Sequence, residues 1–211
     1  AEAAANLDLL GIGVSLTCYG GIVPDADNLG ELVALTQSAE ARIGRRLLVS
    51  GGMSSSLDAL IAGTLPERID SLRIGESILL GVSTVTREPI LGLHTDAIVA
   101  EAPVIEVMRK PSLPRGIVAQ DAFGQKPVFE DRGERWRAIC AIGRQDVVPE
   151  GIVPLDPRVE VLGASSDHLV LDVDALPEPP RIGDMIGFVP NYAATLRLFT
   201  SPYVEKRYVG A

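Results

Sequence analysis

Short apolar runs alternate with helix-like segments over the first 95 residues of the chain. Each apolar run ends in small or polar residues, and the segment after it places its apolar side chains on one helical face. This alternation is typical of a parallel β-sheet whose strands are joined by right-handed helical crossovers. The predicted order is a strand within residues 7–18, a helix at 29–43, a strand at 47–49, a helix at 54–62, a strand at 72–74 and a short helix from residue 76.

The start and the end of the helix at residues 29–43 have their own sequence signals. Asp25 and the polar residues after it are candidate N-caps, and Gly44 is a candidate C-cap. Gly11 and Gly13 come before the first apolar run, and the third glycine of a dinucleotide-binding fingerprint is missing. We therefore interpret this glycine pair as a turn that leads into the strand.

Small and polar residues gather where the second and third predicted strands end. Residues 50–52 lead into the serine triplet 54–56, and Gly75 and Glu76 open the next helix. The free backbone N–H groups at such helix starts bind anions, above all phosphate. The sequence therefore indicates phosphate-binding turns at this edge of the sheet, with N-capping as the structural alternative for the serines.

The pattern changes after about residue 95, where apolar runs become short and prolines and glycines separate them. Short strands at turn-limited spacing are typical of an all-β domain. We predict a domain boundary near residues 94–98. The strand-like segments lie at residues 97–107, 136–143, 159–164, 168–173 and 185–189.

Composition and charge narrow the range of functions. The 211 residues include 46 % hydrophobic and 22 % charged residues, which is ordinary for a globular protein. The net charge of −9 argues against a nucleic-acid surface, so we interpret the arginines around Trp136 as a solvated edge strand. No apolar run is long enough to span a membrane.

The two cysteines, Cys18 and Cys140, lie far apart in the sequence, which favours a reducing, cytoplasmic compartment over a disulfide framework. They and the two histidines, His94 and His168, do not have the spacing of zinc ligands. We therefore expect no metal site.

Seven motifs follow one another along almost the whole chain. They are L-T-C-Y-G-G (16–21), S-G-G-M-S-S-S-L (50–57), L-R-I-G-E-S-I-L-L-G (72–81), D-A-F-G-Q-K-P-V-F-E-D-R-G (121–133), A-I-G-R-Q-D-V (141–147), L-G-A-S-S-D-H-L-V-L-D-V (162–173) and T-S-P-Y-V (200–204). Each motif alone is weak, but the ordered series is specific. In this series the chain resembles the fold-type III, pyridoxal-phosphate-dependent alanine racemase family, and more closely its ornithine-racemase-like branch.

The resemblance implies a barrel of eight strands that binds the cofactor, followed by a β-rich domain. It also implies a head-to-tail homodimer in which the β-domain of one subunit completes the active site of the other. The three strands predicted before residue 95 are too few to close such a barrel. We therefore expect an α/β plus β chain: residues 1–95 form the C-terminal part of a (β/α)8, TIM-like barrel, and residues 96–211 form a mostly β domain with a C-terminal tail.

The resemblance also implies pyridoxal 5′-phosphate as the cofactor and assigns residues to it. Ser54 resembles the serine that binds the cofactor phosphate, and the N–H groups of Gly75 and Glu76 resemble the matching backbone donors. Arg73 resembles the arginine that faces the pyridine nitrogen, and a guanidinium keeps its proton, so the ring nitrogen would stay unprotonated. An ion pair with Glu76 or Asp70 is the structural alternative for Arg73.

Further residues match the family's site more loosely. Thr17 falls where the family often has a histidine beside the cofactor ring. Thr200 and Tyr203 match a C-terminal tyrosine segment that reaches the phosphate, with a plain tail contact as the alternative. Ser166 and Asp167 match the partner-subunit segment near the substrate. Asp167 is also a catalytic candidate, with a surface turn as the alternative.

The chain departs from the family at both acid–base positions. Phe123 occupies the position of the catalytic tyrosine, on the substrate side, and cannot transfer a proton. Asp121, two residues earlier, is a catalytic candidate, with a turn role as the alternative. The only lysines are Lys110, Lys126 and Lys206, all after residue 95. We therefore expect the first half of the barrel, with its cofactor-binding lysine, to be absent and the chain alone to be inactive.

The function predicted from these residues is racemisation of an α-amino acid such as ornithine or alanine by α-proton exchange. A non-catalytic module that binds pyridoxal phosphate or another phosphate, or that only dimerises, is the alternative. A nucleotide-binding α/β protein is a third reading, but no complete phosphate-loop motif is present. We expect neither nucleic acid nor a membrane as a partner.

Overall fold

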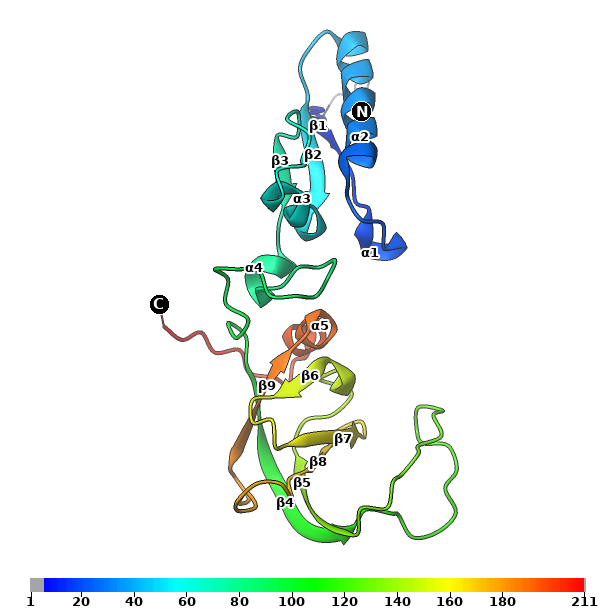
Figure 1. Cartoon of the computed structure of the whole chain (residues 1–211), viewed down its shortest axis with the longest axis vertical. Helices are drawn as coiled ribbons and strands as arrows, with labels where there is room; N and C mark the ends of the chain where they lie inside the picture. The colour runs from blue at the N-terminus through cyan, green and yellow to red at the C-terminus, as the bar shows by residue number, and fades with distance from the viewer. Residues whose placement is uncertain (1–5, 211) are drawn as a thin grey trace. The chain divides into compact units, whose positions relative to one another are not determined.

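The computed structural model describes residues 6–210. The chain divides into two compact units, Ala1–Ala97 and Ile98–Ala211 (Figure 1). The first is an α/β unit and the second is a mostly β unit, which agrees with the coarse fold class expected from the sequence. None of the helices in residues 6–210 has the length and apolar character that crossing a bilayer requires.

The first unit is a parallel sheet of three strands in the order β1-β2-β3. Helix α2 packs against β1 and β2, and Leu29, Leu47 and Val49 are fully buried there. The elements are β1 (Gly11–Gly13), α1 (Thr17–Gly20), α2 (Ala26–Ile43), β2 (Leu48–Met53), the 3-10 turn η1 (Ser54–Ser56), α3 (Leu57–Ile61), β3 (Ser71–Arg73) and α4 (Glu76–Leu80).

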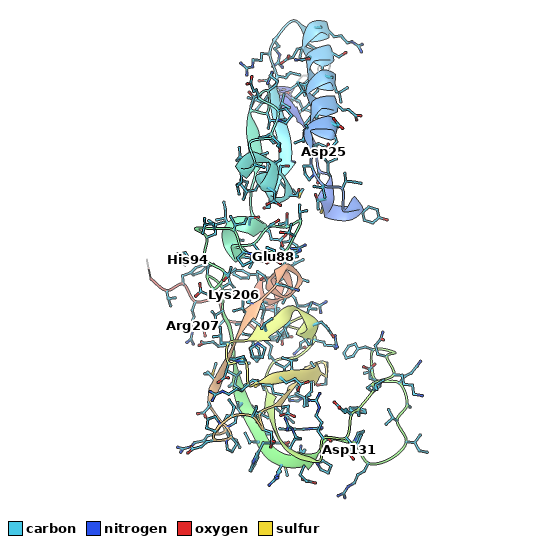
Figure 2. The ribbon with its side chains drawn as sticks, in the orientation of Figure 1. Asp25, Glu88, His94, Asp131, Lys206 and Arg207 are labelled. Atoms are coloured by element: carbon cyan, nitrogen blue, oxygen red, sulfur yellow. The ribbon has the colours of Figure 1, made fainter. Side chains whose placement is uncertain are left out.

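Helix α2 begins and ends where its capping residues predict. Asp25 accepts hydrogen bonds from the N–H groups of Asp27 and Asn28, and the Asn28 side chain accepts one from the Asp25 N–H, which completes a capping box. Figure 2 shows Asp25 at the start of this helix. Gly44 ends the helix in the left-handed conformation that glycine adopts without strain. The helix starts three residues before the predicted first residue, Leu29.

The prediction for residues 7–18 was wrong in its details. The strand is the glycine pair itself, Gly11–Gly13, and the residues from Thr17 onward form the short helix α1. A Cβ on Gly11 would lie 2.4 Å from the carbonyl oxygen of Leu48 on the neighbouring strand. Glycine is therefore needed in β1 for close pairing with β2, which the reading of these glycines as a turn did not anticipate.

The second unit is a six-stranded sheet of order β6-β9-β4-β5-β8-β7, in which every neighbouring pair is antiparallel. The long strand β4 pairs with β9 at its start and with β5 over the rest of its length. The edge strands β6 and β7 contact each other, so the sheet curves into a nearly closed barrel. The elements are β4 (Ala100–Pro111), β5 (Glu134–Cys140), η2 (Pro149–Gly151), β6 (Ile152–Pro154), β7 (Glu160–Ala164), β8 (Leu169–Asp172), β9 (Met185–Pro190) and α5 (Tyr192–Thr200).

Helix α5 packs against this barrel and was not predicted from the sequence. Asn191 caps it by accepting a hydrogen bond from the Ala194 N–H at 3.0 Å. Ala194 and Leu198, four residues apart, join the barrel core. The cap and the four-residue spacing were the available signals for this helix.

The arginines around Trp136 do not lie on an edge strand, which corrects the sequence interpretation. Strand β5 lies between β4 and β8. Arg135 donates to both carboxylate oxygens of Asp172, at 2.9 and 3.1 Å, and also pairs with Asp174. The carboxylates of Asp172 and Asp174 therefore neutralise the charge of Arg135, which the sequence alone had assigned to a solvated edge strand.

Candidate cofactor and substrate site

Ser54 lies directly after β2, and its hydroxyl points at the start of α4. Its Oγ accepts hydrogen bonds from the backbone N–H groups of Gly75, at 3.1 Å, and Ser77, at 3.3 Å. Ser54 is 5 % exposed. The structure therefore brings the second and third predicted strand ends together, with the serine beside the glycine that the family resemblance paired with it.

The residues at this turn suit an anion such as a phosphate. The Ser54 hydroxyl accepts two N–H groups and keeps its own proton free to donate. The hydroxyl of Ser77 is buried and has no hydrogen-bond partner among the described residues. A Cβ built on Gly75 meets no atom within 4 Å, so the backbone there faces open space. Donor groups are what a phosphate needs, and the one carboxylate in this turn, that of Glu76, is paired with Arg87.

Arg73, the last residue of β3, reaches across the ends of the other two strands. Its guanidinium donates to the carbonyl oxygen of Val14 at 2.7 Å and to the hydroxyl of Ser50. No carboxylate pairs with it among the described residues. A guanidinium held by neutral acceptors keeps its full charge available to a ligand.

The ion-pair alternative for Arg73 is wrong, because both proposed partners are engaged elsewhere. Asp70 pairs with Arg46 at 2.9 Å and with Arg68. A hydrogen bond from the Val49 N–H, together with these arginines, lowers the pKa of Asp70 despite the opposing effect of desolvation. Glu76 pairs with Arg87.

Thr17 lies in α1, after the end of β1. Its Oγ1 donates to the carbonyl oxygen of Ile22 at 2.7 Å, within its own turn. The hydroxyl therefore serves the local backbone in this structure, and a role for Thr17 beside the cofactor stays a prediction.

Asp121 and Phe123 lie in the connection between β4 and β5. One oxygen of Asp121 accepts from the N–H groups of Phe123, at 2.9 Å, and Gln125, at 2.8 Å, so this carboxylate caps its own turn. The turn alternative for Asp121 therefore has direct geometric support, while the second carboxylate oxygen has no hydrogen-bond partner among the described residues. The Arg144 guanidinium lies 4.9 Å from the centre of the Phe123 ring, at cation–π distance.

Ser166 and Asp167 lie in the exposed turn between β7 and β8, where the Ser166 hydroxyl donates to Asp167 at 2.6 Å. The turn is held by the segment after β5, because the N–H of Arg144 donates to Ser165 and that of Gln145 donates to Ser166. A Cβ on Gly143 would lie 2.3 Å from the Ser166 carbonyl oxygen, so only glycine permits this approach.

Arg144 is a residue that the sequence reasoning missed. It connects the predicted substrate residue Phe123 with the Ser166–Asp167 turn, and its guanidinium also pairs with both carboxylate oxygens of Glu150. The hydrogen bond from Arg144 lowers the pKa of Glu150. The motif A-I-G-R-Q-D-V had already marked this segment as family-like, but nothing in the sequence said what the arginine contacts.

Thr200 and Tyr203 lie at the end of α5 and just beyond it. The Thr200 hydroxyl donates to the carbonyl oxygens of Leu196 and Arg197, within the helix. The Tyr203 side chain is 78 % exposed, and its N–H donates to the Ser201 hydroxyl at 3.1 Å. Both belong to the second unit, so their cofactor roles stay predictions.

Solved structures place this fold among known ones. An alanine racemase from Bartonella henselae with covalently bound pyridoxal phosphate has a TM-score of 0.57, with 18 % identity, over 90 % of this chain and 50 % of its own. A biosynthetic alanine racemase from Pseudomonas aeruginosa has a TM-score of 0.56, with 17 % identity, over 98 % of this chain and 69 % of its own. At these identities the likeness establishes the fold alone.

Curated relatives are much closer in sequence. An ornithine racemase from Acetoanaerobium sticklandii is 46 % identical, and a lysine racemase from Thermotoga maritima is 44 % identical, each over 202 residues and 95 % of this chain. In sequence the chain is similar to these ornithine and lysine racemases over almost its whole length. It spans 57 % of the length of each of these two relatives, and a scan against models of protein families found no match.

Proposed function

We propose that this chain carries the phosphate-binding and substrate-facing part of a pyridoxal-phosphate-dependent amino-acid racemase. The relatives named above are racemases of ornithine and lysine, so the substrate we propose is a basic α-amino acid, with ornithine first and alanine as the family's other choice. The observation that carries the proposal is the hydrogen bond from the Gly75 N–H to the Ser54 hydroxyl. It lies at the turn to which the family-like motifs assign the cofactor phosphate.

In this proposal, donors in the first unit hold the cofactor by its phosphate. Ser54 would donate its free hydroxyl proton and Glu76 its backbone N–H, while the Gly75 N–H, which donates to the Ser54 hydroxyl in this structure, would turn to the phosphate when the cofactor binds. Bound pyridoxal phosphate supplies an electron-withdrawing ring that acidifies the α-proton of the amino acid. Arg73 would face the ring nitrogen as a permanently protonated donor, so that nitrogen receives no proton from the protein. Thr17, Thr200 and Tyr203 complete the proposed cofactor set.

The second unit would supply groups on the substrate side. Phe123 has no proton to transfer, so the acid–base candidates are the carboxylates of Asp121 and Asp167. Asp167 lies beside the Ser166 hydroxyl in an exposed turn, where a substrate can reach it. In a homodimer of the family type these groups would complete the partner's site. An Asp121→Asn enzyme that racemises at the full rate would leave Asp121 with its turn role only.

A non-catalytic binding module is the second candidate function, and one observation favours it. The first unit contains no lysine, because the three lysines of the sequence are Lys110, Lys126 and Lys206. A chain whose cofactor-binding unit has no lysine would hold pyridoxal phosphate by its phosphate alone. Cytoplasmic location and inactivity of the chain by itself both stay predictions.

Reduction with borohydride separates the two functions. The chain is incubated with pyridoxal phosphate, reduced and digested, and its peptides are analysed by mass spectrometry while ornithine racemisation is followed by chiral chromatography. A covalent adduct on one lysine together with D-ornithine supports a racemase site complete within this chain, and would contradict the predicted inactivity of the chain alone. Saturable binding without an adduct or turnover supports the binding module. Absence of any saturable binding would contradict both proposals.

A further inference from the structure

The segment 143–147, which follows β5, contacts all three regions of the second unit that carry predicted site residues. Its N–H groups at Arg144 and Gln145 hold the turn at Ser165 and Ser166, at 2.9 and 3.0 Å. Its arginine side chain lies against the Phe123 ring. The carbonyl oxygen of Arg144 accepts from Arg197, in helix α5, at 2.6 Å.

Asp146 makes the deepest of these connections. It is 6 % exposed, and its Oδ1 accepts from the hydroxyl of Ser201 at 2.6 Å, across 55 residues of sequence. Ser201 is itself 6 % exposed and comes directly after α5. The same Ser201 hydroxyl accepts from the Tyr203 N–H at 3.1 Å. Asp146 thus holds the backbone on which Tyr203 is carried.

The C-terminal tail is also held at Ser201, by a residue that follows it in the sequence. Lys206 donates from its Nζ to the carbonyl oxygen of Ser201, and Figure 2 labels Lys206 in the tail beyond α5. Hydrogen bonds at Ser201 therefore fix both ends of the segment 200–206. The segment itself contributes little to the barrel core, because Tyr203 is exposed and Val204 only packs at the margin.

Stability alone is a poor explanation for a carboxylate at this place. Asp146 forms no ion pair among the described residues, and a buried carboxylate is costly unless it is well hydrogen-bonded. Well-packed apolar side chains commonly stabilise a site of this kind at least as well as charged ones do. A directional hydrogen bond does, however, fix the position of the segment that it holds, as a loose apolar contact does not.

We propose that Asp146 is a positioning residue which, through Ser201, sets the Thr200–Tyr203 segment at a fixed place relative to the Ser166–Asp167 turn. Asp146 and the N–H groups that hold this turn belong to one short segment, residues 143–147. This segment therefore positions both the Thr200–Tyr203 segment, predicted to contact the cofactor, and the Ser166–Asp167 turn, predicted to contact the substrate. The inference rests on the proposed function for the meaning of that geometry. Its structural half stands on the hydrogen bonds alone.

Amide hydrogen exchange of the full chain tests the structural half. Loss of a hydrogen bond to a charged group in Asp146→Ala should speed exchange at the Tyr203 N–H by about tenfold or more. Exchange in β4 and β5 should stay unchanged, and Asp146→Asn, whose side-chain oxygen can still accept from Ser201, should restore protection. Asp156→Ala, which removes a carboxylate paired with Arg158 at the surface, is the matched control. Unchanged exchange at Tyr203, or equal acceleration in β4 and β5, would overturn the proposal.

Binding of pyridoxal phosphate and of pyridoxal, which lacks the phosphate, tests the functional half. A displaced tail should weaken binding of pyridoxal phosphate to Asp146→Ala by about tenfold, by loss of phosphate hydrogen bonds, and leave pyridoxal binding unchanged. If the variant binds pyridoxal phosphate as the wild type does, or loses both ligands equally, the positioning role is wrong while the proposed function stands. If the wild type binds neither ligand, the proposed function fails, and the role of Asp146 in cofactor binding fails with it.

Discussion

Ser54 and Ser56 stand two residues apart in one short turn, and their hydroxyls make different contacts. Ser56 donates to the carbonyl oxygen of Gly51 at 2.6 Å and so closes the end of β2 onto the turn. Ser54 instead accepts N–H groups from the start of α4 and has a proton left to donate. Both side chains are buried. One serine therefore serves the fold, and the other serves both the fold and, in our proposal, the ligand.

This difference gives a prediction for two serine variants. Ser54→Ala should weaken binding of pyridoxal phosphate about ten- to a hundredfold, because a hydroxyl that donates to a charged phosphate is lost. Ser56→Ala should lower thermal stability and leave the affinity within about twofold of wild type in the folded protein. Titration of each variant by absorbance, with melting curves beside it, makes the comparison. Equal affinities of the Ser54 variant and the wild type would count against the phosphate site.

The two cysteines differ in a way that a thiol reagent can measure. Burial raises the pKa of the Cys140 thiol to about 11, so at pH 8 almost none of it is the reactive thiolate. Cys18 is exposed. We expect one rapidly reacting thiol per native chain and two in denaturant, and peptide mapping should place the native label on Cys18. Rapid labelling of Cys140 under native conditions would mean that the barrel core opens readily.

At the scale of the element, three cases separate what the sequence could predict from what it could not. Helix α2 was predicted because its caps are local. Strand β1 was misread because its glycines are explained only by close approach to Leu48, a contact across more than thirty residues. Strand β5 was misread as an edge because one of its arginines, Arg135, is paired by carboxylates of a distant segment. Capping residues can be recognised in the sequence next to the helix they cap, whereas the partners of a strand are distant in sequence and become known only from the fold.

The site follows the same division. The motifs assigned Ser54 and Gly75 to one phosphate site, and in the structure the Gly75 N–H donates to the Ser54 hydroxyl. The contacts of Arg144 and Asp146 could not be predicted, because each depends on a turn or a tail that is distant in sequence. The roles of the individual residues in cofactor and substrate binding stay predictions.

The pairing of β5 with β8 predicts how stability depends on pH. Burial is the largest single effect and raises the pKa of Asp172, but the hydrogen bonds from Arg135 and from the Asp174 N–H, together with the nearby arginine charges, outweigh it, so the pKa lies below its ordinary value. The folded protein therefore binds this proton less readily than the unfolded chain does. The contribution of Asp172 to the free energy of unfolding is present in full above about pH 4 and is lost as the pH falls through the folded-state pKa.

Asp172→Asn should accordingly destabilise the protein at pH 7 by about 2 kcal/mol, because the Asp172 side chain is 6 % exposed and its partner Arg135 loses a charge-assisted pair. The loss of stability between pH 4 and pH 2 should become shallower than in the wild type. Urea unfolding at a series of pH values measures both effects. Glu160→Gln, which breaks an exposed pair with Arg132, serves as the control and should change stability little. If stability falls between pH 4 and pH 2 as steeply in Asp172→Asn as in the wild type, the proposed role of Asp172 in acid stability is wrong.

At the scale of the whole molecule, the two units bury very different amounts of apolar surface. The contiguous core comprises fourteen buried hydrophobic residues, and all of them lie after residue 98. The described part of the first unit has six, namely Leu29, Leu32, Leu47, Val49, Ala59 and Leu80. This unit also leaves apolar side chains in solvent, with Leu10 65 % and Leu48 53 % exposed. A three-stranded sheet covered mainly on one face gains little free energy against the entropy of ordering its chain.

We therefore expect residues 98–211 to fold alone and residues 1–97 to be much less stable by themselves. The barrel has nearly closed sheet edges, a continuous core and a capped helix packed against it, so each requirement of an independent domain is met within its own sequence. Expressed separately, 98–211 should unfold cooperatively in urea. The midpoint followed by Trp136 fluorescence should be close to the midpoint that the same tryptophan reports in the full chain. The fragment 1–97 should show a broad transition or none. A non-cooperative 98–211 would mean that its stability depends on the first unit, and the division of buried apolar residues would then be a poor guide to how this chain folds.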